Sequence, residues 1–286
     1  MWANRLRVGL FFSLGVIGVS PNAAAGPVAA VPLRVLYAAN QTDSFHDFEA
    51  ILPVIEGDLP KVMPMTVTSV PGNNDDVMDA LAKPGFSAGY DVVLYNLCNA
   101  READFDLAAN ILAETRDRGA PAVALHCTMH TFLTTIGRPF WFGWTGWRLN
   151  QAQRKWADTH GSEPFPVWWD LTGGRTWFHD PKRKFVVKNV APEGDAFETA
   201  FPEEVAWASD ELYNVTDLVP GAVPVLQARS AFSGVTHPVA WHHTFGKGRV
   251  FSTTLGHDAA TVARPDYLRL LATALRWAAD GRGAQP

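Results

Sequence analysis

The chain has 286 residues, a formal charge of −5 at pH 7 and two cysteines. A mildly acidic chain without clusters of Lys and Arg argues against nucleic acid or an anionic membrane surface as its partner. Two cysteines cannot build a disulfide-rich scaffold, and the chain is long enough to bury its own core.

Residues 1–25 predict a secretory signal peptide. Two arginines precede an apolar run from Val8 to Val19, and small residues close the segment at Ala23–Ala25. The run is shorter than the ~20 apolar residues of a spanning helix. We therefore expect cleavage near Ala25 and an exported protein, periplasmic or extracellular, with no membrane span in its mature form. An uncleaved N-terminal anchor is the alternative.

The following segment predicts a parallel sheet. Three apolar runs rich in β-branched residues resemble strands buried on both faces: Leu33–Asn40, Tyr90–Leu97 and Ala120–His126. Helical patterns separate them, and the clearest, Arg101–Gly119, ends on a glycine. Alternation of strands and helices predicts an α/β fold with right-handed crossovers.

The second half of the chain has a different amino-acid composition. Tryptophan, glycine and proline crowd the segment from Arg138 to Trp177, which we interpret as an irregular insertion over the top of the sheet. Regular structure resumes with two strands, a C-terminal β-hairpin and an amphipathic helix: Lys184–Val190, Ala222–Arg229, Pro238–Gly256 and Pro265–Asp280. We expect a single domain over residues 33–282.

Polar residues follow the predicted strands at the point where each strand ends. In an open parallel sheet, ligands bind beyond these carboxyl ends. The residues placed there are Asn40, His46, Asn96, Cys98, His126, Cys127, His130, His257 and Asp258. The sequence therefore predicts a His-rich rim along one edge of the sheet, able to bind a metal or move protons.

Several of these residues also have a structural interpretation. Cys127 is expected to be a small buried side chain, and a disulfide to Cys98 is conceivable, although we expect the two thiols to be unpaired. Four histidines are expected to be structural or exposed: His160, His237, His242 and His243. Three tryptophans could either stack on a sugar or pack the insertion against the sheet: Trp141, Trp144 and Trp147.

Four stretches carry a resemblance to a known family: "LHCTMH", "DLTGGRTWFHDP", "SDELYN" and "PVAWHHTFGKGRVFSTTLGHD". Together they resemble the ThuA-like (trehalose utilisation) family, whose fold is similar to class I glutamine amidotransferases. The resemblance implies a flavodoxin-like, doubly wound, mostly parallel sheet and a carbohydrate substrate. The chain departs from the family at Ala191, where a histidine is usual, and in a longer segment between His130 and Val167.

The resemblance, with the rim, leads to a predicted site. The predicted catalytic residues are His126, His179, His257, Asp210 and Glu211. The predicted substrate-binding residues are His46, Asn96, His130, Tyr213 and Trp241. A carboxylate beside histidines orients an imidazole or ligates a metal, so both kinds of site are open.

We therefore expect an exported sugar-processing enzyme that acts on a disaccharide or keto-sugar derivative by His/carboxylate acid–base chemistry. A metal-dependent hydrolase with a zinc-like divalent ion at the histidines is one alternative, and a non-catalytic carbohydrate- or partner-binding domain is another. A cysteine hydrolase is the weakest, because His126 takes the elbow position and Cys127 follows it. No glycine-rich nucleotide-binding fingerprint follows the first predicted strand, which argues against a nicotinamide cofactor.

Overall fold

The computed structural model describes residues 31–41, 45–133 and 144–281, with side chains of the last range described from residue 151 apart from Ala208. The chain from Val31 onward forms one compact unit. The predicted signal peptide lies outside the described residues. Among the helices that are described, none is both long and apolar enough to cross a bilayer.

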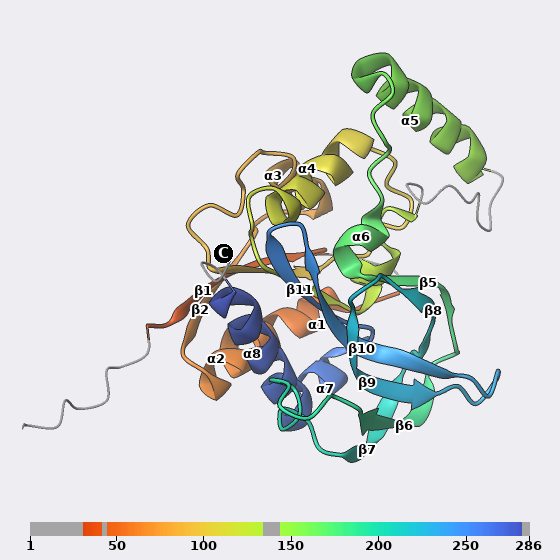
Figure 1. Ribbon diagram of the computed structural model, residues 1–286. Coiled ribbons are helices and arrows are strands. Elements are labelled where there is room, and N and C mark those ends of the chain that lie inside the picture. Colours follow the sequence, from red (N-terminus) through yellow and green to blue (C-terminus); the bar gives the residue numbers. More distant parts are fainter. Residues whose placement is uncertain (1–30, 42–44, 134–143, 282–286) are drawn as a thin grey trace, which may run out of the picture. The chain divides into compact units, whose positions relative to one another are not determined.

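A nine-stranded sheet in the order β2-β1-β3-β4-β11-β10-β9-β6-β7 forms the centre of this unit (Figure 1). Its strands are β1 (Leu33–Ala39), β2 (Met65–Ser69), β3 (Val92–Asn96), β4 (Ala122–Leu125), β6 (Arg183–Asn189), β7 (Glu204–Asp210), β9 (Val223–Arg229), β10 (Thr236–Phe245) and β11 (Gly248–Thr253). The first five strands in this order are parallel, and β10, β9, β6 and β7 extend the sheet with antiparallel pairs. A separate antiparallel pair joins β5 (Gly174–His179) to β8 (Tyr213–Leu218).

Helices pack on both faces of the parallel part of the sheet. The helical segments are α1 (Phe48–Pro53), a π-helical turn (Val54–Asp58), α2 (Leu59–Val62), α3 (Asn74–Leu81), α4 (Phe105–Arg116), a 3₁₀ turn (His126–His130), α5 (Trp144–His160), α6 (Trp168–Thr172), α7 (Ala259–Val262) and α8 (Pro265–Asp280). The α/β class with a mostly parallel sheet, expected from the sequence, is confirmed.

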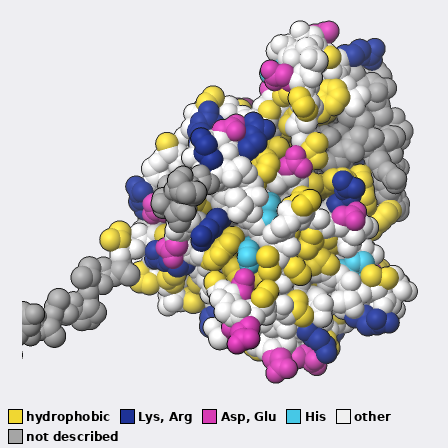
Figure 2. Space-filling model, viewed as in Figure 1, with side chains coloured by type: hydrophobic (Ala, Val, Ile, Leu, Met, Phe, Trp, Pro, Cys, Tyr) yellow, Lys and Arg dark blue, Asp and Glu magenta, His cyan; other side chains and the backbone are white. Residues whose placement is uncertain are grey.

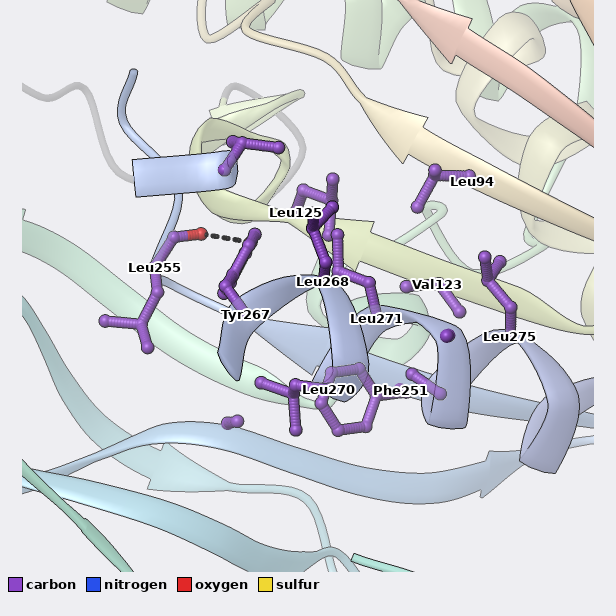
Figure 3. Close-up of a cluster of buried hydrophobic side chains, with 14 of the residues drawn as sticks. Leu94, Val123, Leu125, Phe251, Leu255, Tyr267, Leu268, Leu270, Leu271 and Leu275 are labelled. Carbon is purple, nitrogen blue, oxygen red and sulfur yellow. Dashed lines mark hydrogen bonds between the residues drawn. The ribbon is translucent and has the colours of Figure 1, made fainter. Parts of the chain in front are cut away.

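The two faces of β1 contribute to two different cores, as the period-two alternation of a strand requires. Val35 and Tyr37 belong to the core that includes α1, α2 and α8, whereas Leu36 and Ala38 belong to the one beneath α3 and α4. Figure 3 shows side chains of α8 packed against strand residues of the sheet, and the hydroxyl of Tyr267 donates to the backbone oxygen of Leu255 at 2.8 Å. The strand ends are therefore held by packing on both sides.

The Trp-rich insertion is more regular than the sequence interpretation allowed. Residues Trp144–His160 form the helix α5, so the expectation of an irregular excursion is wrong for this part. Apolar residues recur there at near-helical spacing, and the density of tryptophan masked the pattern. Trp156 is buried and its indole Nε1 donates to the backbone oxygen of Glu163 at 3.1 Å. Trp141 lies outside the described residues, and the side chains of Trp144 and Trp147 are not described.

The hairpin of β10 and β11 matters for the site because it brings the end of β11 beside the end of β4. Val250 to Thr253 pair in parallel with Ala122 to Leu125. The chain that leaves β11 and the chain that leaves β4 therefore emerge at the same edge, next to the ends of β3 and β1. This edge is where the predicted His-rich rim lies.

Candidate functional site

His126 occupies a strained position at the turn that follows β4. Its backbone φ is +42°, in the left-handed region that non-glycine residues seldom adopt. Its side chain is 2% exposed, and its Nδ1 lies 2.7 Å from the backbone oxygen of Thr254. A carbonyl can only accept, so Nδ1 carries the proton in this contact and Nε2 is left to face the site.

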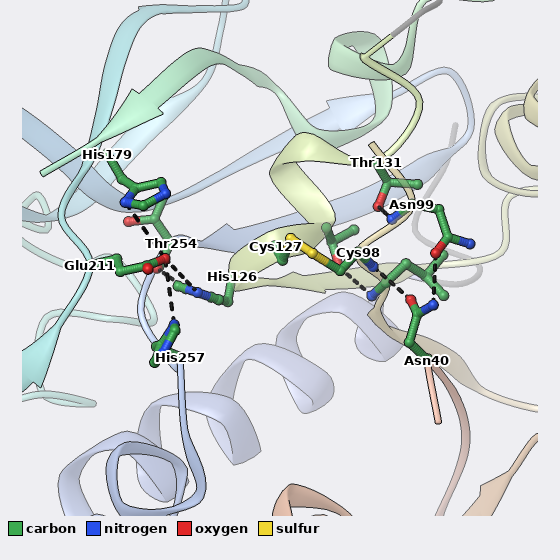
Figure 4. The surroundings of a disulfide bond; sticks show 12 residues. Asn40, Cys98, Asn99, His126, Cys127, Thr131, His179, Glu211, Thr254 and His257 are labelled. Carbon is green, nitrogen blue, oxygen red and sulfur yellow. Dashed lines mark hydrogen bonds and ion pairs between the residues drawn. A yellow bond between two sulfur atoms is a disulfide. The ribbon is translucent and has the colours of Figure 1, made fainter. Parts of the chain in front are cut away.

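Glu211 is the point on which three imidazoles converge (Figure 4). Its Oε2 lies 3.4 Å from Nε2 of His126, 3.5 Å from Nδ1 of His257 and 3.7 Å from Nδ1 of His179. Glu211 follows β7, His257 follows β11, and His179 ends β5. Residues that are distant in sequence thus meet because their strands end at one place.

Asp210 is buried, and its carboxylate is held by four N–H groups. One carboxylate oxygen accepts from Nε1 of Trp207 and the backbone N–H of Gly256, at 3.0 and 2.9 Å. The other accepts from the backbone N–H groups of Glu211 and His257, at 2.8 and 3.3 Å. These contacts correct the predicted catalytic role: the Asp210 carboxylate positions the two residues that face the site.

Two further histidines and a tyrosine complete the cluster. The ring centroid of His46 lies 5.1 Å from that of His126 and 4.9 Å from that of His257. Tyr213 is buried and stacks on His130, with centroids 4.4 Å apart. The centroid of His179 lies 5.2 Å from the same tyrosine ring. Of the predicted substrate-binding residues, the structure therefore brings His46, His130 and Tyr213 to the cluster.

The electrostatics of the cluster favour one fixed negative charge. Burial by itself would raise the pKa of Glu211, but the neighbouring imidazoles of His126 and His257 outweigh it and hold that pKa far below its usual range. Burial opposes the charged form of His126, yet the carboxylates of Glu211 and Asp210 leave its pKa raised overall. For His130 burial dominates, and together with the nearby imidazoles of His179 and His126 it lowers the pKa to about 3.

The cluster fits a divalent cation. His46, His126, His257 and Glu211 each offer one ligand atom, and these four atoms all lie within 4.8 Å of one another. Among the described residues, neither Nε2 of His126 nor Nδ1 of His257 has a hydrogen-bond partner, although both atoms are buried. Two ligands bound to one zinc ion at ~2.1 Å in tetrahedral geometry would lie roughly 3.4 Å apart. The His–Glu211 distances match this value better than that of a charge-assisted hydrogen bond, which is about 2.8 Å.

The two cysteines form a disulfide, contrary to our expectation of unpaired thiols. Cys98 and Cys127 each lie two residues beyond the end of a strand, and those strands, β3 and β4, are neighbours. Their equal distance from adjacent parallel strand ends is the signal that could have predicted the pair. Cys127 therefore has no free thiol in this state, and its side chain is buried. An amidotransferase-like cysteine nucleophile does not fit this geometry.

Two predicted substrate-binding residues lie in the core instead of at the cluster. Trp241 is completely buried, and its Nε1 donates to the backbone oxygen of Thr172 at 2.8 Å. Asn96 is also buried, and its amide donates to the hydroxyl of Tyr37 at 3.0 Å. Both side chains therefore support the fold, which corrects their predicted contact with substrate.

The remaining polar residues of the rim have local partners. Asp258 accepts from the backbone N–H of Thr261 at the start of α7, and it pairs with Lys182 at 2.5 Å. The four histidines interpreted as structural or exposed have partners elsewhere: His160 with Asp106, His242 with Asp195, His237 with the Val215 backbone oxygen and His243 with the Asp170 backbone oxygen.

The cluster is reachable from one side. The His179 side chain is 37% exposed, whereas those of His257 and Glu211 are only partly exposed. The face of the molecule drawn in Figure 2 carries histidine side chains among hydrophobic ones. A ligand would therefore approach past His179 toward the more buried Glu211.

The fold and the strand-end site define the class of protein: an α/β protein with a cluster of histidines and a carboxylate at the ends of its strands. A family model described as trehalose utilisation, ThuA, matches residues 143–278 of the chain. The predicted resemblance is confirmed.

Two solved structures support the fold. A protein from Parabacteroides merdae described as ThuA-like is 16% identical, with a TM-score of 0.61 over 90% of this chain and 93% of its own. A second, from Bacteroides uniformis, is 15% identical, with a TM-score of 0.57 over 88% of this chain and 93% of its own. Among curated proteins, none matches the sequence significantly.

Proposed function

We propose that this protein is an exported sugar-transforming enzyme whose site binds a divalent cation and acts on a disaccharide or a keto-sugar derivative. The observation that carries the proposal is the group of four ligand atoms from His46, His126, His257 and Glu211, which all lie within 4.8 Å of one another. The family supports a sugar as substrate. The geometry favours a metal centre over the metal-free acid–base site that the sequence first indicated.

The residues that would hold the cation are His46, His126, His257 and Glu211. When bound, such an ion would polarise a carbonyl or hydroxyl oxygen of the sugar. The protein's own part is to fix the ligands in advance. The backbone oxygen of Thr254 sets the tautomer of His126. The Asp210 carboxylate accepts from the backbone N–H groups of Glu211 and His257 and so holds these two ligands in place. Support of this kind keeps ligand atoms in place before substrate arrives.

His179 is the proposed proton-transfer residue. Its Nδ1 lies 3.1 Å from the backbone oxygen of Asp180, so Nδ1 donates there and Nε2 is free of the proton. The ring is the most exposed imidazole of those around Glu211. It can therefore meet a substrate hydroxyl or a C–H beside a carbonyl and accept a proton from it. Isomerisation, elimination and hydrolysis all need such a base.

The test combines metal analysis with a substrate screen on the full chain. We expect one zinc-like ion per chain in the purified protein, its loss in Glu211→Gln, and turnover of a disaccharide or its 3-keto form that a chelator abolishes. If the folded protein turns over sugar without any metal, the reaction uses acid–base chemistry alone and the proposed cation is wrong. A folded, metal-loaded protein that binds sugars without changing them would make it a binding protein.

A further inference from the structure

The disulfide lies against the proposed cation site through His46. His46, Cys98 and Cys127 each offer one ligand atom, and the three atoms lie within 4.8 Å of one another. His46 also belongs to the group with His126 and Glu211. The imidazole of His46 is therefore shared between the proposed cation ligands and the two sulfur atoms of the disulfide. Figure 4 shows the disulfide next to His126.

We propose that reduction of the Cys98–Cys127 disulfide creates a second metal site, in which both thiolates and His46 bind a soft cation. In the disulfide each sulfur is bonded to the other, so neither can act as a thiolate ligand. Reduction breaks the S–S bond, adds two electrons and two protons and yields two thiols. A dithiol supplies both electrons and protons and is itself oxidised to a disulfide. Metal binding then displaces the two thiol protons.

The framework permits this change without rearrangement of the sheet. The two cysteines follow the ends of neighbouring strands, their Cα atoms lie 5.0 Å apart, and the strands pair directly over Val93–Tyr95 and Ala122–Ala124. Hydrogen bonds hold the turn after β3 independently of the disulfide: Cys98 N–H donates to Asn40, and Leu97 N–H donates to Thr128. The sulfur atoms therefore stay close together after reduction.

The chemistry of the donors sets which ion the second site takes. Two thiolates and one imidazole suit zinc, cadmium or copper(I), and they disfavour the hard ions magnesium and manganese. The group of three imidazoles and one carboxylate has no sulfur and accepts a wider range of ions. The oxidation state of one disulfide would thus change the metal preference of the whole rim.

Cadmium titration of the full chain tests the proposal, because cadmium bound to thiolate absorbs in the ultraviolet and cadmium bound to nitrogen and oxygen does not. We expect the absorption in protein reduced with a dithiol and separated from it, saturating at one ion per chain. The oxidised protein should lack it. Cys98→Ser should abolish it under reducing conditions, and His46→Asn should weaken cadmium binding to the thiolates.

A reduced, folded protein without this absorption would overturn the proposal, as would an equal cadmium affinity in wild type and His46→Asn. Circular dichroism of the reduced chain is the companion measurement, and loss of tertiary structure on reduction would also refute it by making the disulfide purely structural. The inference rests on the proposed cation site only through His46. The two proposals can therefore fail separately. The metal content of the oxidised protein tests the proposed function, and the thiolate–cadmium absorption of the reduced protein tests the second site.

Discussion

The Asp210 carboxylate accepts a hydrogen bond from the backbone N–H of Glu211 at 2.8 Å, so the first of these two consecutive acids positions the second. Asp210 is fully buried and Glu211 faces the histidines. Successive residues at the end of a strand point to opposite sides, which explains the division.

Asp210→Asn should destabilise the protein strongly. The buried carboxylate accepts four N–H groups, and an amide would present donors to some of them. We expect the free energy of unfolding to fall by about 3 kcal/mol. Denaturant unfolding measures this, with Asp217→Asn as the matched control on an exposed acid. Equal stability of the two variants would contradict the positioning role.

His179→Asn and His257→Asn should separate proton transfer from metal binding. His257 is a proposed ligand, so its variant should lose the ion. His179 is not in the ligand group, so its variant should keep the ion while turnover falls by ~10²–10⁴-fold. Metal content and kcat are measured on the same preparations. Metal loss in His179→Asn would move that residue into the ligand set.

Cys127→Ser should lower the free energy of unfolding strongly and the turnover rate only slightly. It opens a disulfide that spans 29 positions of the chain, and a loop of that length corresponds to about 3–4 kcal/mol of unfolding free energy. The double variant with Cys98→Ser should cost no more than either single variant, because one bond is lost in each. His126→Ala, in contrast, should lose nearly all turnover. A folded but inactive Cys127→Ser would favour a covalent cysteine mechanism.

Acid should destabilise the fold through His243. Burial lowers its pKa from 6.5 to about 4, and its Nε2–H donates to the backbone oxygen of Asp170 at 3.2 Å. The unfolded chain binds more protons between these two values, so this contribution is complete above pH 6.5 and is lost as the pH falls to 4. The loss approaches about 3 kcal/mol.

The measurement for His243 compares unfolding free energies at neutral and acid pH in wild type and in His243→Asn. The variant cannot take up this proton, so its stability should fall less steeply with acid than that of wild type. Identical pH profiles would show that the burial of His243 has no part in acid sensitivity.

Sequence patterns predicted much of the scaffold. Apolar, β-branched runs indicated the strands that became β1, β3 and β4, and the expected helix Pro265–Asp280 has the same bounds as α8. These elements are readable because each is governed by local periodicity and by burial on a known face. The rule that parallel strands end at one edge also indicated that His126 and His257 would be close.

Tertiary structure alone decided how the site is built. The sequence marked both Asp210 and Glu211, yet only packing around Trp207 and Gly256 determined which carboxylate faces the histidines. It marked Trp241 as a ligand contact, whereas the fold buries that ring completely. It favoured unpaired thiols at Cys98 and Cys127, whereas their disulfide depended on β3 and β4 becoming neighbours. Local patterns specify which residues form an element; the direction of a side chain at a strand end depends on contacts with residues far away in the chain.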